Sequence, residues 1–321
     1  MIRRRALGVL LCACLLSSLG AAAQESAPAQ AQRYGDYYYG RPKIYTFITQ
    51  WPGDFVGFGR LVYQKEAIPW IAATAGSTAL LIWKDQYLVD RAYNLGNRLG
   101  IPHTTDQKTL FSIPVMGDSF AFGAPSDLGN GLYFIGDGWV QMGLAGCFLG
   151  YGWLDSNNRA LQTSSEIVES LLTSGSVVQV LKHVTGREDP ILATAPGGRW
   201  RFFPNQTDYH QHVPKYDAFP SGHLAAATAA FTVIQENYSG YWVLRPVGWT
   251  LLAVLGFQMM NNGVHWAGDY PLALALGWSF GHVAVQRGRT AAKPIAQTPS
   301  ALEFSPMLTE GGAGVMARFK F

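Results

Sequence analysis

Apolar and polar residues fall into long separate blocks along most of this 321-residue chain. Six apolar blocks, each long enough for a helix, cover residues 67–84, 137–154, 166–182, 221–236, 243–262 and 270–286. The intervening stretches 85–136 and 183–220 are polar and rich in glycine and proline, which is typical of loops. The pattern therefore predicts an all-α fold, a helical bundle of about six apolar helices with long loops.

The length of these blocks leaves two interpretations open. A transmembrane helix needs about 20 mostly apolar residues, and the blocks lie at the lower edge of that length. Several of them contain polar side chains, among them Gln141, Glu166, Glu169, Glu236 and Arg245. The pattern fits short membrane spans and also the apolar helices of a soluble or membrane-seated bundle.

The two ends of the chain follow other patterns. Residues 24–33 are rich in Ala, Gln and Pro and predict a flexible leader, whereas residues 37–63 are rich in aromatic side chains and predict irregular or short-strand structure. From Gly314 to Phe321 apolar and polar residues alternate, as in a strand, and we expect this tail to pair with the aromatic N-terminal region. The domain boundaries predicted in this way are 1–23, 24–65, 66–290 and 291–321.

Residues 1–23 have the layout of a secretory signal peptide. Three arginines precede an apolar stretch from Leu7 to Leu16, and the run Ala21-Ala22-Ala23 supplies a cleavage site of the A-x-A type. The alternative is an uncleaved membrane anchor. We expect an exported protein, periplasmic or associated with the inner or the outer membrane.

The charge balance argues against a nucleic-acid-binding protein. The chain has 24 Lys and Arg against 21 Asp and Glu, and the three arginines near the N-terminus account for the whole excess. Proteins that bind nucleic acid concentrate a basic excess on one face. Beyond the signal peptide Cys147 is the one cysteine, and its apolar, glycine-rich surroundings predict a buried structural thiol.

The first segment with recognisable chemistry is Pro220-Ser221-Gly222-His223, directly before an alanine-rich helical run. Gly222 allows a backbone N–H group to approach a ligand closely, and the N-terminus of a helix favours an anion. Ser221 adds a hydroxyl group, and His223 adds a titratable proton donor. The segment predicts an anion site beside a proton donor.

Two further segments carry charged groups. His265 and Asp269 are four residues apart, which places them one helical turn apart on the same face. A carboxylate so placed can hold one ring nitrogen protonated and leave the other free as a nucleophile; the alternative is an ordinary surface pair. Lys182 and Arg187 lie at the end of an apolar helix, where cations usually compensate the helix dipole.

In this order the three segments resemble the type 2 phosphatidic-acid phosphatase superfamily, which includes bacterial class A acid phosphatases and vanadium-dependent haloperoxidases. The family pattern is Lys-x6-Arg-Pro, then Pro-Ser-Gly-His, then Ser-Arg-x5-His-x3-Asp. The resemblance covers about residues 166–286 and implies a six-helix bundle with the motifs at helix ends.

The resemblance implies catalytic roles for three residues. His265 would attack phosphorus to form a phosphohistidine, Asp269 would orient His265, and His223 would protonate the leaving oxygen. Hydrolysis of a phosphomonoester in this way needs no metal and no cofactor. The implied partner is a phosphorylated small molecule or lipid with membrane contact, and the oligomeric state stays open.

The resemblance also implies a phosphate-binding group of Lys182, Ser221 and Gly222, but two positions depart from the family pattern. Asp189 and Met259 stand where the family has arginines. The predicted site therefore lacks two cations and gains one anion, and loss of a single preorganised donor can cost 10²–10³ in rate.

Nearby arginines are candidates to replace the missing cations. We hypothesise that Arg187, together with Arg199 or Arg201, completes the phosphate-binding group; the alternative is that the two loop arginines are solvated.

For the enzyme, the apolar composition and the 10 tryptophans favour a lipid phosphate or pyrophosphate as substrate. Two other functions remain, a non-catalytic relative that binds a lipid headgroup or stabilises an envelope assembly, and a vanadate-dependent oxidase.

Overall fold

The computed structural model describes residues 31–104, 107–115, 118–292, 302–309 and 312–319. The predicted signal peptide and most of the predicted leader lie outside the described residues. So does segment 293–301 of the predicted linker.

The described part of the chain is mostly helical, as predicted, and contains ten α-helices. These are α2 (Thr46–Thr49), α3 (Trp51–Val62), α4 (Ile68–Leu99), α5 (Leu128–Phe134), α6 (Gly138–Leu154), α7 (Asn158–Thr185), α8 (Gln206–Gln211), α9 (Gly222–Asn237), α10 (Leu244–Asn261) and α11 (Tyr270–Gly288). Short 3₁₀ turns lie at η1 (Lys65–Ala67), η2 (Pro190–Leu192), η3 (Val213–Lys215) and η4 (Ala267–Asp269).

The six apolar blocks correspond to α4, α6, α7, α9, α10 and α11. The largest difference concerns α4, which continues to Leu99 although its apolar block ends at Lys84. Its second half keeps a buried stripe at helical spacing, formed by Asp85, Val89, Ala92 and Gly96. The 12-residue helix α3 also replaces part of the structure expected to be irregular.

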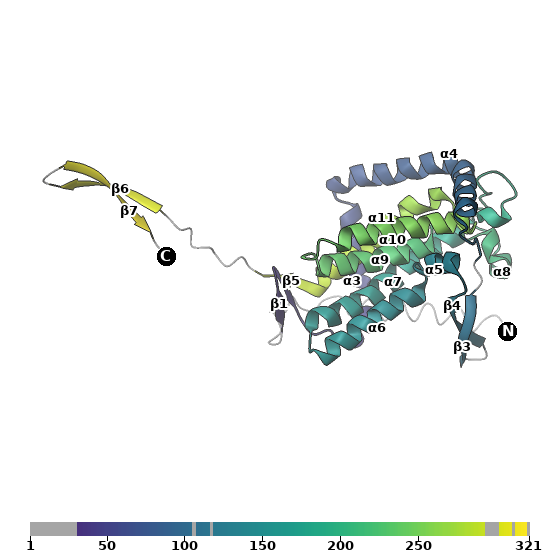
Figure 1. The fold of residues 1–321 in the computed structure, drawn as a ribbon, viewed down its shortest axis with the longest axis horizontal. Coiled ribbons are helices and arrows are strands. Elements are labelled where there is room, and N and C mark those ends of the chain that lie inside the picture. The colour runs from purple at the N-terminus through teal and green to yellow at the C-terminus, as the bar shows by residue number, and fades with distance from the viewer. Residues whose placement is uncertain (1–30, 105–106, 116–117, 293–301, 310–311, 320–321) are drawn as a thin grey trace.

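Helices α7, α9, α10 and α11 run side by side in the body of the molecule, α6 lies along α7, and α4 lies above them in this view (Figure 1). The main apolar core lies between α7, α9, α10 and α11 and includes Val178, Leu224, Leu255 and Phe280. Helices α9 and α11 approach closely at Gly277, where a Cβ atom would lie 2.4 Å from the carbonyl oxygen of Ala225.

The helix ends follow from local sequence. The side chain of Ser221 accepts a hydrogen bond from the N–H of Leu224 and so caps the N-terminus of α9. Asn157 caps α7 in the same way, through the N–H of Ala160. At the other end of α7, Gly186 adopts the left-handed conformation with φ of 53° and turns the chain out of the helix.

Within the described residues, three small antiparallel sheets accompany the helices. Strand β2 (Tyr37–Tyr39) pairs with β1 (Gln32–Tyr34) on one side and with β5 (Arg289–Ala291) on the other. Strands β3 (Gln107–Val115) and β4 (Asp118–Pro125) form a hairpin in a region expected to be a loop. Strands β6 (Leu302–Thr309) and β7 (Gly312–Phe319) form a second hairpin, apart from the helices in Figure 1.

Two sequence predictions need correction. The C-terminal tail pairs within its own hairpin, because a preceding strand supplies a local partner; only β5 pairs with the aromatic N-terminal region. Cys147 is exposed on α6 rather than buried, since the surface of that helix is itself apolar and composition alone did not reveal its orientation.

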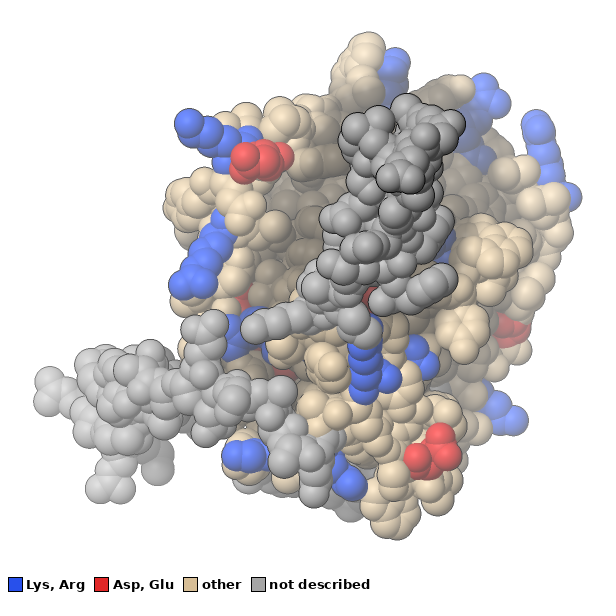
Figure 2. All heavy atoms as spheres, turned by 90° about the vertical axis from the view of Figure 1, so that its left-hand side faces the viewer, with Lys and Arg blue, Asp and Glu red and all other residues tan. Residues whose placement is uncertain are grey.

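No helix in the described part of the chain is long and apolar enough to cross a membrane. Figure 2 views the molecule from its left-hand side in Figure 1. Most of the visible described atoms belong to uncharged residues, and Lys and Arg side chains are scattered over this face rather than gathered in one patch.

Candidate active site

The carboxylate of Asp269 and the ring of His265 lie together, but not on an α-helix. Residues 267–269 form η4, and α11 begins only at Tyr270. His265 Nδ1 lies 2.8 Å from the carbonyl oxygen of Ala218 and 3.6 Å from Asp269 Oδ2. Because both neighbours are acceptors, Nδ1 carries a proton, and Nε2 is the ring nitrogen left to act as a nucleophile.

The carboxylate of Asp269 is held from two sides. Its Oδ2 accepts a hydrogen bond from the backbone N–H of Trp266 at 2.7 Å, and its Oδ1 accepts one from Arg187 Nη1 at 2.6 Å. Asp269 is fully buried. These contacts fix the carboxylate beside the imidazole.

Arg187 is itself enclosed. Its Nη2 donates to Asp85 Oδ2 at 2.5 Å and to the carbonyl oxygen of Gly197 at 2.7 Å. Its side chain is fully buried, and its guanidinium lies over the rings of Trp200 and Trp266. This placement differs from the expected one in the phosphate-binding group, because both terminal nitrogens already bind carboxylates.

Asp85 is a site residue that the sequence analysis missed. Besides Arg187 it binds the backbone N–H of Gly268, through Oδ1 at 2.7 Å, so α4 contacts the turn that carries Asp269. The sequence did contain a signal, since Asp85 continues the stripe of Val89 and Ala92 at helical spacing. A lone carboxylate in such a stripe requires a buried partner.

Lys182, at the end of α7, lies at the N-terminus of α9. A Cβ atom on Gly222 would lie 3.7 Å from Lys182 Nζ, and the backbone N–H of Ser221 donates to the carbonyl oxygen of Asp269 at 3.2 Å. Lys182 Nζ also forms an ion pair with Asp217 Oδ2 at 2.8 Å. The sequence analysis missed Asp217, which lies in the loop before Pro220.

His223 lies in the first turn of α9 and faces His265. The centroids of the two rings are 6.3 Å apart, and the ring of Tyr133 lies against His223 at 4.5 Å. Burial, together with the nearby His265 and Lys182, lowers the pKa of His223 to about 3. His223 is therefore neutral near pH 7 while the site is empty of anions.

Asp189 and Met259, which stand where the family pattern has arginines, have different surroundings. Met259 is fully buried in the core, and its sulfur accepts a hydrogen bond from Ser221 Oγ at 3.4 Å. Asp189 is 5% exposed. Burial and the neighbouring Asp217 raise the pKa of Asp189 to about 9, so this side chain is protonated and uncharged near neutral pH.

The loop arginines contact Glu188. Arg201 Nη2 lies 2.5 Å from Glu188 Oε1, and the backbone N–H of Arg199 donates to Glu188 Oε2. Burial alone would raise the pKa of Glu188, but the N–H groups of Thr194 and Arg199 and the guanidinium of Arg201 lower it to about 2. Arg201 thus stabilises the loop 188–201 through Glu188.

The structure brings together six predicted site residues, Lys182, Ser221, Gly222, His223, His265 and Asp269. It places Arg187 behind Asp269 and pairs Arg201 with Glu188. Among the described residues no group of three or more histidine, cysteine or acidic side chains is arranged to hold a metal ion.

One of three comparisons with known proteins found a match, and it covers the segment that contains these groups. Searches of curated proteins and of solved structures gave no match to the chain. A family model described as PAP2 superfamily matches residues 165–292, the segment from α7 to just past β5. The resemblance inferred from the three sequence segments is thereby confirmed: residues 165–292 carry the pattern of the PAP2 superfamily.

Proposed function

We propose that the protein is a phosphatase that hydrolyses a phosphomonoester through a phosphohistidine on His265. The observation that carries the proposal is the state of His265, whose Nδ1 is held by Ala218 and Asp269 so that Nε2 is free to attack. The match to the PAP2 superfamily supports hydrolysis of phosphate esters in general.

In this mechanism Nε2 of His265 attacks phosphorus as the bond to the leaving oxygen breaks. The protonated form of His223 gives its proton to that oxygen and, once neutral, accepts a proton from the water that hydrolyses the phosphohistidine. Lys182, Ser221 and the N–H groups at the start of α9 bind the phosphate oxygens. Asp269 stabilises the positive charge that develops on His265.

We further propose an amphiphilic substrate such as a lipid phosphate, with membrane contact in an exported protein. Four tryptophans support this proposal because each is at least 70% exposed: Trp70, Trp83, Trp153 and Trp242. Exposed apolar side chains of this size mark surfaces that contact lipid or other apolar partners.

A second candidate is binding of a phosphorylated headgroup without turnover. It is favoured by the carboxyl groups of Asp189 and Asp217 beside Lys182, because a site with fewer cations and more acidic groups stabilises the transition state of phosphate transfer less well. Phosphate release from phosphatidic acid and from a chromogenic phosphomonoester tests both functions, with His265→Ala as control. Release by the wild-type protein that the variant loses supports the enzyme. Binding of phosphatidic acid without release supports the second candidate.

A further inference from the structure

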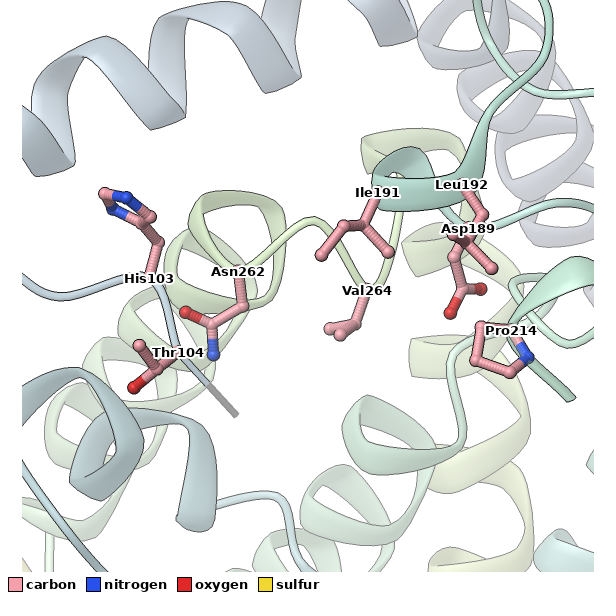
Figure 3. Close-up of a pocket in the computed structure, with 8 residues that line it drawn as sticks. All are labelled: His103, Thr104, Asp189, Ile191, Leu192, Pro214, Asn262 and Val264. Carbon is pink, nitrogen blue, oxygen red and sulfur yellow. The ribbon is translucent and has the colours of Figure 1, made fainter. Parts of the chain in front are cut away.

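A cavity of about 400 Å³ opens beside the candidate active site. Its lining residues are His103, Thr104, Asp189, Ile191, Leu192, Pro214, Asn262 and Val264, and Figure 3 shows how they lie. Val264 directly precedes His265, and Asp189 lies near the charged groups of Lys182, Asp217 and Asp269. The volume is within the range of about 300–1,000 Å³ found for small-molecule sites.

Most of the wall is apolar, but two buried polar side chains line it. Asp189 and Asn262 are 5% and 3% exposed. Within the described residues Asp189 Oδ1 and Asn262 Nδ2 have no hydrogen-bond partner. A buried polar atom without a partner costs free energy, so a ligand with one polar group for each atom would remove that cost.

The backbone fixes Asp189 without using its side chain. Its N–H donates to the carbonyl oxygen of Pro214 at 2.9 Å, and its carbonyl oxygen accepts from Leu192 at 3.1 Å. Asp189 precedes η2 but its carboxyl group forms no cap there. The carboxyl group is therefore held at the cavity wall and remains free to bind a ligand.

The orientation of Asn262 is fixed as well. Its Oδ1 accepts a hydrogen bond from Gln258 Nε2 at 2.6 Å, and the same Gln258 nitrogen donates to the carbonyl oxygen of Pro102 at 2.9 Å. With Oδ1 occupied, Nδ2 is the atom that can donate to a ligand. In Figure 3 Asn262 and Asp189 lie on opposite sides of Val264.

We infer that this cavity holds the alcohol part of the phosphate ester, and that Asp189 and Asn262 select an alcohol with hydroxyl groups near the ester oxygen. One hydroxyl group can donate to the Asp189 carboxyl, and a second hydroxyl group of the same alcohol can accept from the Asn262 amide on the other side of Val264. An ammonium group can bind only Asp189. An alkyl group would leave both atoms unpaired, which sites built for hydroxyl groups reject. The inference rests on the proposed phosphatase function.

Binding measured by calorimetry on the His265→Ala protein tests this selection without turnover. Glycerol 1-phosphate should bind at least about tenfold more tightly than propyl phosphate, which has the same carbon chain. Asp189→Ala and Asn262→Ala, each added to His265→Ala, should each bring the ratio of the two dissociation constants close to one. Asp155→Ala, an exposed carboxylate at the end of α6, is the matched control and should keep the ratio.

Equal affinities for the two esters would overturn the inference, and so would tighter binding of phosphoethanolamine than of glycerol 1-phosphate. A ratio that both cavity variants leave unchanged would also overturn it. Lysophosphatidic acid, compared with dodecyl phosphate, tests whether the hydroxylated alcohol belongs to a lipid. Failure of the proposed phosphatase function would be recognised differently. The wild-type protein would then release no phosphate, whatever the ratio of the two dissociation constants.

Discussion

Arg187 Nη1 and Asp269 Oδ1 are joined by a hydrogen bond of 2.6 Å, and neither side chain is exposed to solvent. The same guanidinium binds Asp85, so one buried cation forms ion pairs with carboxylates from α4 and from the turn before α11. The arrangement connects the orientation of His265 to a helix far away in the sequence. Arg187 is thus a positioning residue that acts through Asp269.

Replacement of this cation should destabilise the fold and slow the reaction. Arg187→Met leaves Asp85 and Asp269 buried without a counter-charge, and breaking such a pair costs about 3–5 kcal/mol. Urea unfolding measures the stability, and phosphate release measures kcat. Arg199→Met, on the exposed loop, should change stability by less than about 0.5 kcal/mol. Equal unfolding midpoints for Arg187→Met and wild type would contradict this account.

Phosphatase activity should increase as the pH falls from 7 to 5. The pKa of His223 is lowered to about 3 by burial and by the nearby His265 and Lys182, so its protonated, proton-donating form is scarce at pH 7 and becomes more abundant as the pH falls. A pH profile of kcat/KM on a phosphomonoester checks this. A maximum above pH 8 would show that His223 is not the proton donor.

Activity should decrease further as the pH rises through about 9. Burial and Asp217 raise the pKa of Asp189 to about 9, so alkaline pH adds a negative charge next to Lys182 and repels the phosphate dianion. The decrease should be found in KM. Asp189→Asn, which cannot ionise, should have a KM that changes less between pH 8 and 10 than that of the wild-type protein. Parallel KM profiles would exclude this role.

The protein should lose stability as the pH rises from 5 to 9. Burial raises the pKa of Glu166 to about 8 and, with Asp54 nearby, that of Glu169 to about 10. In the unfolded chain these groups ionise near pH 4.5. The folded state therefore binds more protons in this window, and its stability is present at low pH and lost as the pH rises.

Thermal unfolding between pH 5 and 9 checks the sign of this dependence. Glu166→Gln should reduce the slope of Tm against pH, because an amide keeps the hydrogen bond with Asn237 and cannot ionise. A variant whose Tm falls as steeply as that of the wild-type protein would show that other groups are responsible.

Replacement by alanine should change the free energy of unfolding in opposite directions at two glycines, Gly175 within α7 and Gly186 at its C-cap. At Gly186 φ is 53°, and a Cβ atom would lie 2.2 Å from the carbonyl oxygen of Arg201, so Gly186→Ala should destabilise by at least about 2 kcal/mol. At Gly175 nothing lies within 4 Å of the added atom, and Gly175→Ala should stabilise by about 0.5–1 kcal/mol. Urea unfolding of both variants separates the two effects; similar shifts would contradict the prediction.

The sequence predicted those features that depend on neighbouring residues. Apolar periodicity located the main helices, and the Pro-Ser-Gly-His segment located the start of α9 because Ser221 is a cap. The rest depends on contacts between distant elements. Nothing local distinguishes an Arg187 that faces phosphate from one that faces two buried carboxylates, since its surroundings depend on Asp85, 102 residues away in the chain. For the same reason polar composition predicted a loop where α4 continues past Lys84.

The small sheet of β1, β2 and β5 marks a place where a label can be attached far from the candidate active site. It contacts the N-terminal turns of α7, where Asn158 and Gln162 donate to the carbonyl oxygens of Tyr39 and Gly40, whereas Lys182 lies at the opposite end of that helix. Twenty-eight residues of α-helix span about 40 Å. A fluorophore or a surface anchor attached beside this sheet would therefore sit well away from His265 and leave the approach of substrate unobstructed.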